Sequence, residues 1–182
     1  FILMYAIVDI ETTGGNHKSG RITEIAVYEY DNGRITELFQ SLVNPECSIP
    51  PFVQNLTGIT NKMVAKAPVF EEISEELYEV LNSRIFVAHN VSFDYNFIKT
   101  SFNRFAQQEF NVPYVCTIQL SRKILPGYGS YGLGKLCKEI GIEINGRHRA
   151  AGDALATAKL FDILMQKDRS AVLSLIKGNI NR

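Results

Sequence analysis

The stretch LMYAIVDIETTGG, residues 3–15, places two acids at the end of the most apolar segment of the chain. A continuous apolar run of this kind is typical of a central strand that is buried on both faces. Side chains two positions apart on a strand share a face, so we expect Asp9 and Glu11 to point the same way. Two carboxylates beside a hydrophobic core are costly unless a positive charge lies between them. The alternative is that Glu11 lies beyond the strand and reaches water.

The segments that follow predict a mixed α/β domain. Residues 22–30 and 34–43 are expected to form two strands, joined by the hairpin signal Asp31-Asn32-Gly33. The prolines near residues 45–51 predict a loop. Shorter strands are expected at 84–88 and 112–115, and helices at 70–81, 92–108, 117–124, 131–140, 150–166 and 171–177. Three early strands, then helices alternating with short strands, favour an α/β sandwich around a mixed sheet.

Two further acids occupy positions where apolar side chains are expected. On the helix near residues 92–108, Asp94 lines up with Phe97 on the core-facing stripe, and a capping role is the alternative. On the helix near residues 150–166, Asp153 aligns with Leu160 on the inward face. His148 lies close by between two arginines, which favours a functional over a structural role.

Four inward-facing acids at the ends of elements have one economical explanation, which is that they bind divalent cations. Oxygen-only ligands suit Mg²⁺ or Mn²⁺ rather than zinc. Carboxylates that hold a metal pair are the usual machinery of phosphodiester cleavage, where one ion activates a water and the other stabilises the leaving oxygen. A histidine nearby can accept the proton of that water.

Three motifs resemble those of the DnaQ-like (DEDDh) superfamily of 3′→5′ exonucleases. They are DIETTG at residues 9–14, NVSFD at 90–94 and HRAAGD at 148–153. The resemblance covers about residues 4–166 and is nearest to the epsilon proofreading subunits of bacterial DNA polymerase III. The stretch LTGIT at residues 56–60, followed by Ala67-Pro68, is similar to the loop that joins the first two motifs in this family.

The resemblance implies a ribonuclease-H-like fold, with a five-stranded mixed sheet flanked by helices in a single exonuclease domain, residues 1–182. It implies hydrolysis from the 3′ end of single-stranded or frayed DNA in proofreading or repair, with release of 5′-mononucleotides. The ligands of two Mg²⁺ or Mn²⁺ ions would be Asp9, Glu11, Asp94 and Asp153, with His148 as general base. Contacts with the terminal nucleotide would involve Thr12, Thr13, Leu56, Thr57 and Phe93, while Asn90 would hold the second-motif loop.

Composition sets bounds on the partners of the chain. A net charge of +0 argues against coating long nucleic acid but suits a pocket that holds one strand end. The apolar runs are too short for a bilayer, and three cysteines without metal-ligand spacing suit a reducing cytoplasm. Few residues follow position 166, so a long polymerase-binding tail is not seen, and we expect the excised domain of a longer protein. The candidate partners are a DNA polymerase, which the short tail disfavours, and a fused nuclease domain.

Three other functions are alternatives to a DNA exonuclease. A 3′→5′ exoribonuclease of the same superfamily remains open. An aspartyl-phosphate phosphatase would need another acid just after Gly152-Asp153, where the chain continues ALAT. A catalytically inactive nucleic-acid-binding module predicts the loss of a key residue, whereas all five are present.

Overall fold

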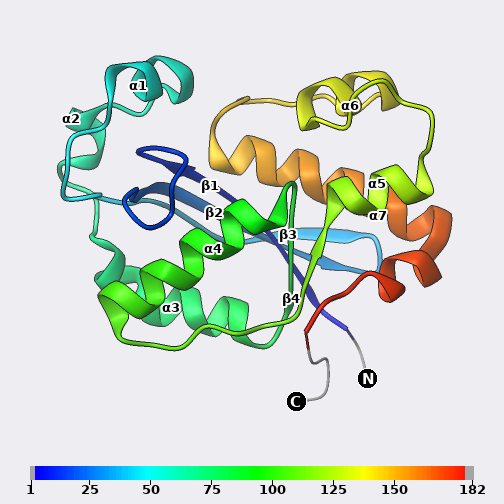
Figure 1. The fold of residues 1–182 in the computed structure, drawn as a ribbon, viewed down its shortest axis with the longest axis horizontal. Coiled ribbons are helices and arrows are strands. Elements are labelled where there is room, and N and C mark those ends of the chain that lie inside the picture. Colours follow the sequence, from blue (N-terminus) through cyan, green and yellow to red (C-terminus); the bar gives the residue numbers. More distant parts are fainter. Residues whose placement is uncertain (1–2, 179–182) are drawn as a thin grey trace.

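The apolar run that opens the chain forms the central strand of a five-stranded mixed sheet, as predicted. The computed structural model describes residues 3–178 and orders the strands β3-β2-β1-β4-β5 (Figure 1). The strands are β1 (Tyr5–Thr12), β2 (Ile22–Asp31), β3 (Arg34–Leu42), β4 (Ile85–Ala88) and β5 (Tyr114–Cys116). β2 pairs antiparallel with β1 and β3, whereas β4 pairs parallel with β1 and β5.

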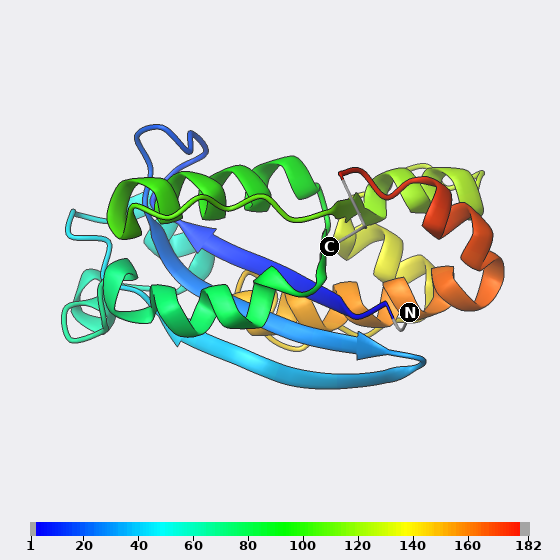
Figure 2. The same cartoon turned by 90° about the horizontal axis from the view of Figure 1, so that it is seen from below.

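Helices cover both faces of the sheet (Figures 1 and 2). One face is covered by α5 (Thr117–Ile124) and α7 (Ala150–Ser174), and α6 (Leu133–Ile140) packs on α7. The other packs against α3 (Phe70–Asn82), α4 (Val91–Ser101) and the π-helix that continues α4 (Phe102–Ala106). None of the helices within residues 3–178 is both long and apolar enough to cross a membrane.

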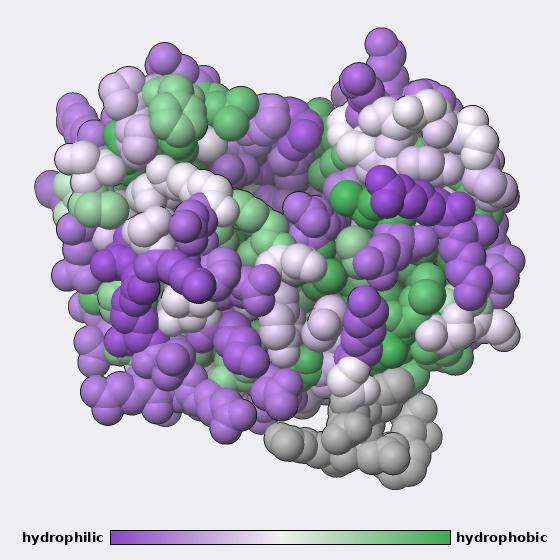
Figure 3. Space-filling model, in the orientation of Figure 1, coloured by the Kyte–Doolittle hydropathy of each residue, from purple (hydrophilic) through white to green (hydrophobic). Residues whose placement is uncertain are grey.

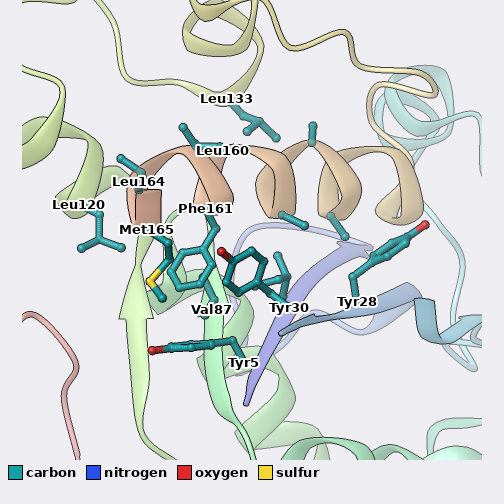
Figure 4. Packing of buried hydrophobic residues seen from close by; sticks show 14 of the residues in the cluster. Tyr5, Tyr28, Tyr30, Val87, Leu120, Leu133, Leu160, Phe161, Leu164 and Met165 are labelled. Atoms are coloured by element: carbon teal, nitrogen blue, oxygen red, sulfur yellow. The ribbon is translucent and has the colours of Figure 1, made fainter. Parts of the chain in front are cut away.

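Alternation along β1 decides which face carries the acids. Tyr5 and Ile7 belong to the core on the α7 side, and Figure 4 shows Tyr5, Tyr30 and Phe161 turned toward one another there. The Phe161 ring centroid lies 5.0 Å from that of Tyr5 and 5.2 Å from that of Tyr30. Because the strand period is two, Asp9 shares this face and is directed to the side of the sheet that α7 covers.

The prolines after β3 mark a loop at residues 45–50, as predicted. Two short helices that the sequence analysis did not predict follow it, α1 (Pro51–Thr57) and α2 (Asn61–Val64). Pro51 occupies the first helical position, where its missing N–H costs no hydrogen bond. A small separate core holds the segment together and consists of Ile49, Val53, Ile59 and Val64. Packing of these four residues stabilises two helices that are too short to be stable alone.

The helices that flank the site also differ in length from the prediction. The two helices expected at 150–166 and 171–177 are present within α7, separated by a kink at Asp168, whose backbone is not helical, and the second ends at Ser174. The helix expected at 92–108 is regular only to Ser101 and then widens into the π-helix. Neither change moves the first turn of α4 or of α7, which carry Asp94 and Asp153.

Gly152 lets the loop before α7 lie directly on the first turn of that helix. A Cβ atom at Gly152 would lie 2.3 Å from the carbonyl oxygens of both Asn145 and Gly146. These are backbone atoms, so a side chain at this position would displace the loop that carries His148.

Gly152→Ala should therefore destabilise the protein, although alanine is favoured over glycine in a helix by about 1 kcal/mol. Overpacking of this kind typically costs about 1–3 kcal/mol. The change in free energy of unfolding can be measured by urea denaturation. Gly129→Ala is the control, because a Cβ there meets nothing within 4 Å. Equal stability of Gly152→Ala and the parent would contradict the close contact.

Candidate active site

The carboxyl end of β1 extends beyond its parallel partner. The ladder between β1 and β4 runs from Tyr5–Ile85 to Ile7–Val87. Further along, the backbone N–H of Ile10 donates to Oδ1 of Asp94 at 3.2 Å. Asp94 lies in the first turn of α4 and is only 3% exposed. Its carboxylate thus takes the place of a strand partner and brings α4 against the end of β1.

Three of the four predicted ligands gather at this point. Asp9, Glu11 and Asp153 can each offer an oxygen within 4.8 Å of the other two. Glu11 lies inside β1, as expected, and is paired with Glu24 of β2, which excludes the alternative that it lies beyond the strand. Asp94 is not a member of this trio of described residues, but its charge acts on Asp9. The arrangement is three clustered acids with a fourth beside them.

Crowding and burial together make the ionised cluster unfavourable. Burial, and then the charges of Asp94, Asp153 and Glu11, raise the pKa of Asp9 well above its ordinary value. Burial also raises the pKa of Asp94 well above its ordinary value. The pKa of Glu11 is raised to about 7 by burial and by the charges of Asp153 and Glu24. Such shifts mark a site that a cation would stabilise.

Asp153 provides a direct test of whether the cluster suits a cation. Its Oδ2 atom pairs with the Arg147 guanidinium and accepts the backbone N–H of His148 at 3.3 Å. Its Oδ1 atom is buried and finds no hydrogen-bond partner among residues 3–178. Burial raises the pKa of this carboxyl, and Arg147 opposes that effect. An unpartnered buried oxygen in an oxygen-only donor set fits Mg²⁺ or Mn²⁺.

His148 lies on a short loop between two ion pairs. Its neighbour Arg147 contacts Asp153, and its other neighbour Arg149 contacts Glu24. The backbone of His148 is left-handed, with φ +61°, which is uncommon for a residue other than glycine. The histidine is half-buried at the edge of the acid cluster. Two contacts therefore hold an unusual backbone conformation in place.

Sequence reasoning missed Glu24 as a member of the site region. Its side chain is 1% exposed and binds the Arg149 guanidinium through both oxygens, at 2.6 and 3.0 Å. It also accepts the backbone N–H of Ala150 at 2.9 Å. An acid that begins the apolar run Ile25-Ala26-Val27 was the available signal, and it is the same anomaly that identified Asp9.

The threonines predicted to contact the terminal nucleotide differ in the hydrogen bonds that their hydroxyls make within the protein. The Thr12 hydroxyl donates to the Gly14 carbonyl at 2.9 Å, and the Thr13 hydroxyl accepts the Arg21 N–H at 3.0 Å. The Thr57 side chain is buried. Its hydroxyl donates to the Val53 carbonyl and accepts the Ile59 N–H. Thr57 therefore ends α1, whereas Thr12 and Thr13 shape the turn after β1.

The apolar candidates are more accessible. Leu56 is 55% exposed at the end of α1. Phe93 is half-buried, with its ring centroid 4.9 Å from that of Phe97. Asn90 precedes α4 with a left-handed backbone, and its side chain makes no capping bond to the described chain. The surface is indented between the α1–α2 segment and α6, the region where β1 ends and α7 begins, and hydrophilic residues line the indentation (Figure 3).

Comparison of sequences identifies relatives of this chain. Residues 6–161 match the family model RNase_T, described as exonuclease. The chain is 37% identical over 174 residues to the 3′-5′ exonuclease DinG of Bacillus subtilis (strain 168), which covers 95% of this chain and 19% of that protein. It is 35% identical over 163 residues to the DNA polymerase III subunit epsilon of Aquifex aeolicus (strain VF5), which covers 90% of this chain and 81% of that protein. The chain thus spans about a fifth of the DinG proteins it matches.

Solved structures give the same result. Exonuclease X in complex with 5′ overhanging duplex DNA superposes with a TM-score of 0.78 at 29% identity, covering 94% of this chain and 96% of that one. The cell-death related nuclease CRN-4 superposes with a TM-score of 0.76 at 18% identity, covering 91% and 64%, and shows the shared fold alone. The ribonuclease-H-like fold expected from the motifs is confirmed. A family match across residues 6–161 and a relative of similar length at 35% identity lead to one conclusion, that the chain belongs to the RNase_T family of exonucleases.

Proposed function

We propose that this exonuclease domain removes nucleotides one at a time from the 3′ end of single-stranded or frayed DNA and releases 5′-mononucleotides. The observation that carries the proposal is the trio Asp9, Glu11 and Asp153, with carboxylate oxygens within 4.8 Å of one another and one buried Asp153 oxygen that finds no partner within residues 3–178. The names of the relatives support a 3′→5′ direction, and the Exonuclease X complex supports DNA as the substrate.

The metal site of the proposal holds two Mg²⁺ or Mn²⁺ ions through Asp9, Glu11, Asp94 and Asp153. When bound, such ions supply an activated water and stabilise the charge that develops on the leaving oxygen. The chain contributes the rigidity of the site. Asp94 is held by the Ile10 N–H, and Asp153 is held by Arg147 and the His148 N–H.

His148 is the proposed general base. Its backbone N–H donates to Asp153, so the residue is held next to a candidate metal ligand. His148 is half-buried, so it is not fully enclosed by the protein. The role of His148 is to take the proton from the attacking water, while the acids hold the cations.

The terminal nucleotide would be held by the turn after β1 and by two apolar side chains. The Thr12 hydroxyl keeps free lone pairs that can accept from a 3′-hydroxyl, and the Thr13 hydroxyl keeps its own hydrogen to donate. Leu56 and Phe93 would contact the base or sugar, which is a sequence-tolerant form of recognition. Thr57 and Asn90 would act by shaping the α1 end and the second-motif loop.

Partnership and location belong to the proposal as well. The epsilon relative is a polymerase subunit by name, and the DinG relatives are about five times as long as the matched domain. Both facts support action beside a DNA polymerase or beside a further domain, such as a nuclease domain, of a longer protein. The free cysteines Cys47, Cys116 and Cys137 fit a reducing cytoplasm.

The direction of attack is tested with a 5′-labelled single-stranded DNA in the presence of Mn²⁺ or Mg²⁺. We expect a ladder that shortens by one nucleotide at a time, because only a free 3′ end fits the pocket. A copy with a 3′-phosphate and a closed single-stranded circle should both resist digestion. Cutting of the circle would show an endonuclease. Faster digestion of a matched RNA would establish the exoribonuclease instead.

His148→Ala should lower turnover by about 10²–10⁴-fold, the usual contribution of a general base. The affinity for Mn²⁺, measured by calorimetry, should stay near that of the parent protein, because His148 is not a proposed ligand. His17→Ala is the control, since His17 is outside the acid cluster and bonds to Thr100. A His148→Ala protein with most of its activity would show that the histidine is structural.

The stability of the metal-free protein should fall as pH rises from about 4.5 to about 7. Glu11 has an ordinary pKa of 4.5 and a folded-state pKa of about 7, so the folded state holds the proton that the unfolded state has lost. Stability decreases wherever the folded state binds more protons. Melting temperatures across this range should therefore decline less in Glu11→Gln, and less in the parent with Mn²⁺ present. The exposed Glu75→Gln is the control and should follow the parent. A parent curve without any decline would contradict the crowded cluster.

A further inference from the structure

Glu24 is a buried carboxylate that the proposed metal site does not use. It is directly paired with Glu11 across the antiparallel strands β1 and β2. Residues directly opposite on neighbouring strands point to the same face, so both acids are directed toward α7. Like charges at opposed positions destabilise a sheet, and Glu24 contributes to the raised pKa of Glu11. A second acid at this position needs a structural reason.

The contacts of Glu24 differ from those of the candidate ligands. Its Oε1 atom accepts from Arg149 at 2.6 Å. Its Oε2 atom accepts from Arg149 at 3.0 Å and from the Ala150 N–H at 2.9 Å. Ala150 is the first residue of α7, where backbone N–H groups have no partner inside the helix. Both oxygens are therefore occupied by a bidentate guanidinium and a helix end, which leaves Glu24 satisfied without a metal.

These contacts join β2 to the residue that follows His148. The loop of residues 145–149 approaches the helix at Gly152 and is tied to it on one side through Arg147 and Asp153. Arg149 supplies the tie on the other side, to a strand 125 residues away in the sequence. The left-handed backbone of His148 is unfavourable by itself, so it persists because both neighbours are held.

We propose that the Glu24–Arg149 pair is a positioning device for catalysis. It fixes the loop of residues 145–149 on the sheet that carries Asp9 and Glu11, and so sets where the His148 imidazole lies relative to the acids. Glu24 and Arg149 are positioning residues, because neither needs to contact substrate. The inference rests on the proposed role of His148 and adds that an ion pair outside the metal cluster determines how well His148 performs it.

The test compares Glu24→Gln and Arg149→Lys with a matched control on the same strand. Glu29 on β2 pairs with Arg84 at 2.7 Å and is partly buried, so Glu29→Gln removes a similar ion pair far from the His148 loop. We expect Glu24→Gln and Arg149→Lys to lower kcat by about 10- to 100-fold, because small misplacements of a reacting group cost rates of this order. KM for a single-stranded oligonucleotide should change little. Glu29→Gln should keep the parent kcat.

Two further measurements separate positioning from other effects. In a His148→Ala background, Glu24→Gln should add no further loss, because a residue that acts through His148 has nothing left to position. In the metal-free protein, amide hydrogen exchange of residues 145–150 should accelerate in Glu24→Gln and Arg149→Lys, while exchange in the middle of α7 stays at the parent rate.

The outcomes are distinguishable from those of the proposed function. An unchanged kcat in Glu24→Gln, or a loss that adds in full to that of His148→Ala, would overturn the inference. If His148→Ala alone retains activity, the general-base assignment fails. Unchanged exchange of residues 145–150 would then show that Glu24 does not hold the loop, whereas faster exchange would show that it does. A variant that loses stability is assayed below its melting temperature, with Glu29→Gln assayed at the same temperature as the control.

Discussion

Repulsion among carboxylates at the end of β1 is the constraint around which this molecule is arranged. Asp9 and Glu11 share a face of the central strand, and α7 brings Asp153 within 4.8 Å of both. α4 adds Asp94 through a bond to the Ile10 N–H, where the ladder with β4 has ended. Burial and mutual charge raise the pKa of these acids, so the metal-free cluster opposes folding. The large cores on both faces of the sheet supply the free energy that holds the acids together.

Hydrogen bonding distinguishes the acid that has a structural role from the acids that are candidate metal ligands. Glu24 is as buried as any acid of the site, yet both of its oxygens have partners in Arg149 and Ala150. Asp153 has one oxygen bound to Arg147 and the other buried without a partner in the described chain. Burying an unsatisfied carboxylate oxygen is costly, so its persistence points to a cation. Whether both carboxylate oxygens have hydrogen-bond partners, rather than burial alone, distinguishes a structural acid from a candidate metal ligand.

The site combines rigid elements, which carry the acids, with accessible segments, and this combination suits the end of a DNA strand. The acids are anchored on a central strand and on the first turns of two helices, which hold positions well. The surfaces that would meet the nucleotide lie on shorter segments, with Leu56 exposed on α1 and His148 on a loop. A small core of its own stabilises the α1–α2 segment beside the indentation in Figure 3.

The sequence by itself determined the central strand, the four acids, His148 and the mixed α/β architecture. An acid in an apolar periodic pattern is visible in the local chain, because periods of two and 3.6 residues decide which side chains face the core. Helices α1 and α2 were not predictable, since they depend on a tertiary core of Ile49, Val53, Ile59 and Val64 rather than on local propensity. Only the tertiary structure decided that Glu24 pairs with Arg149 and that Asp153 keeps an unpartnered oxygen. Pairing across 125 residues depends on strand register and helix placement, and neither is encoded in any short stretch of sequence.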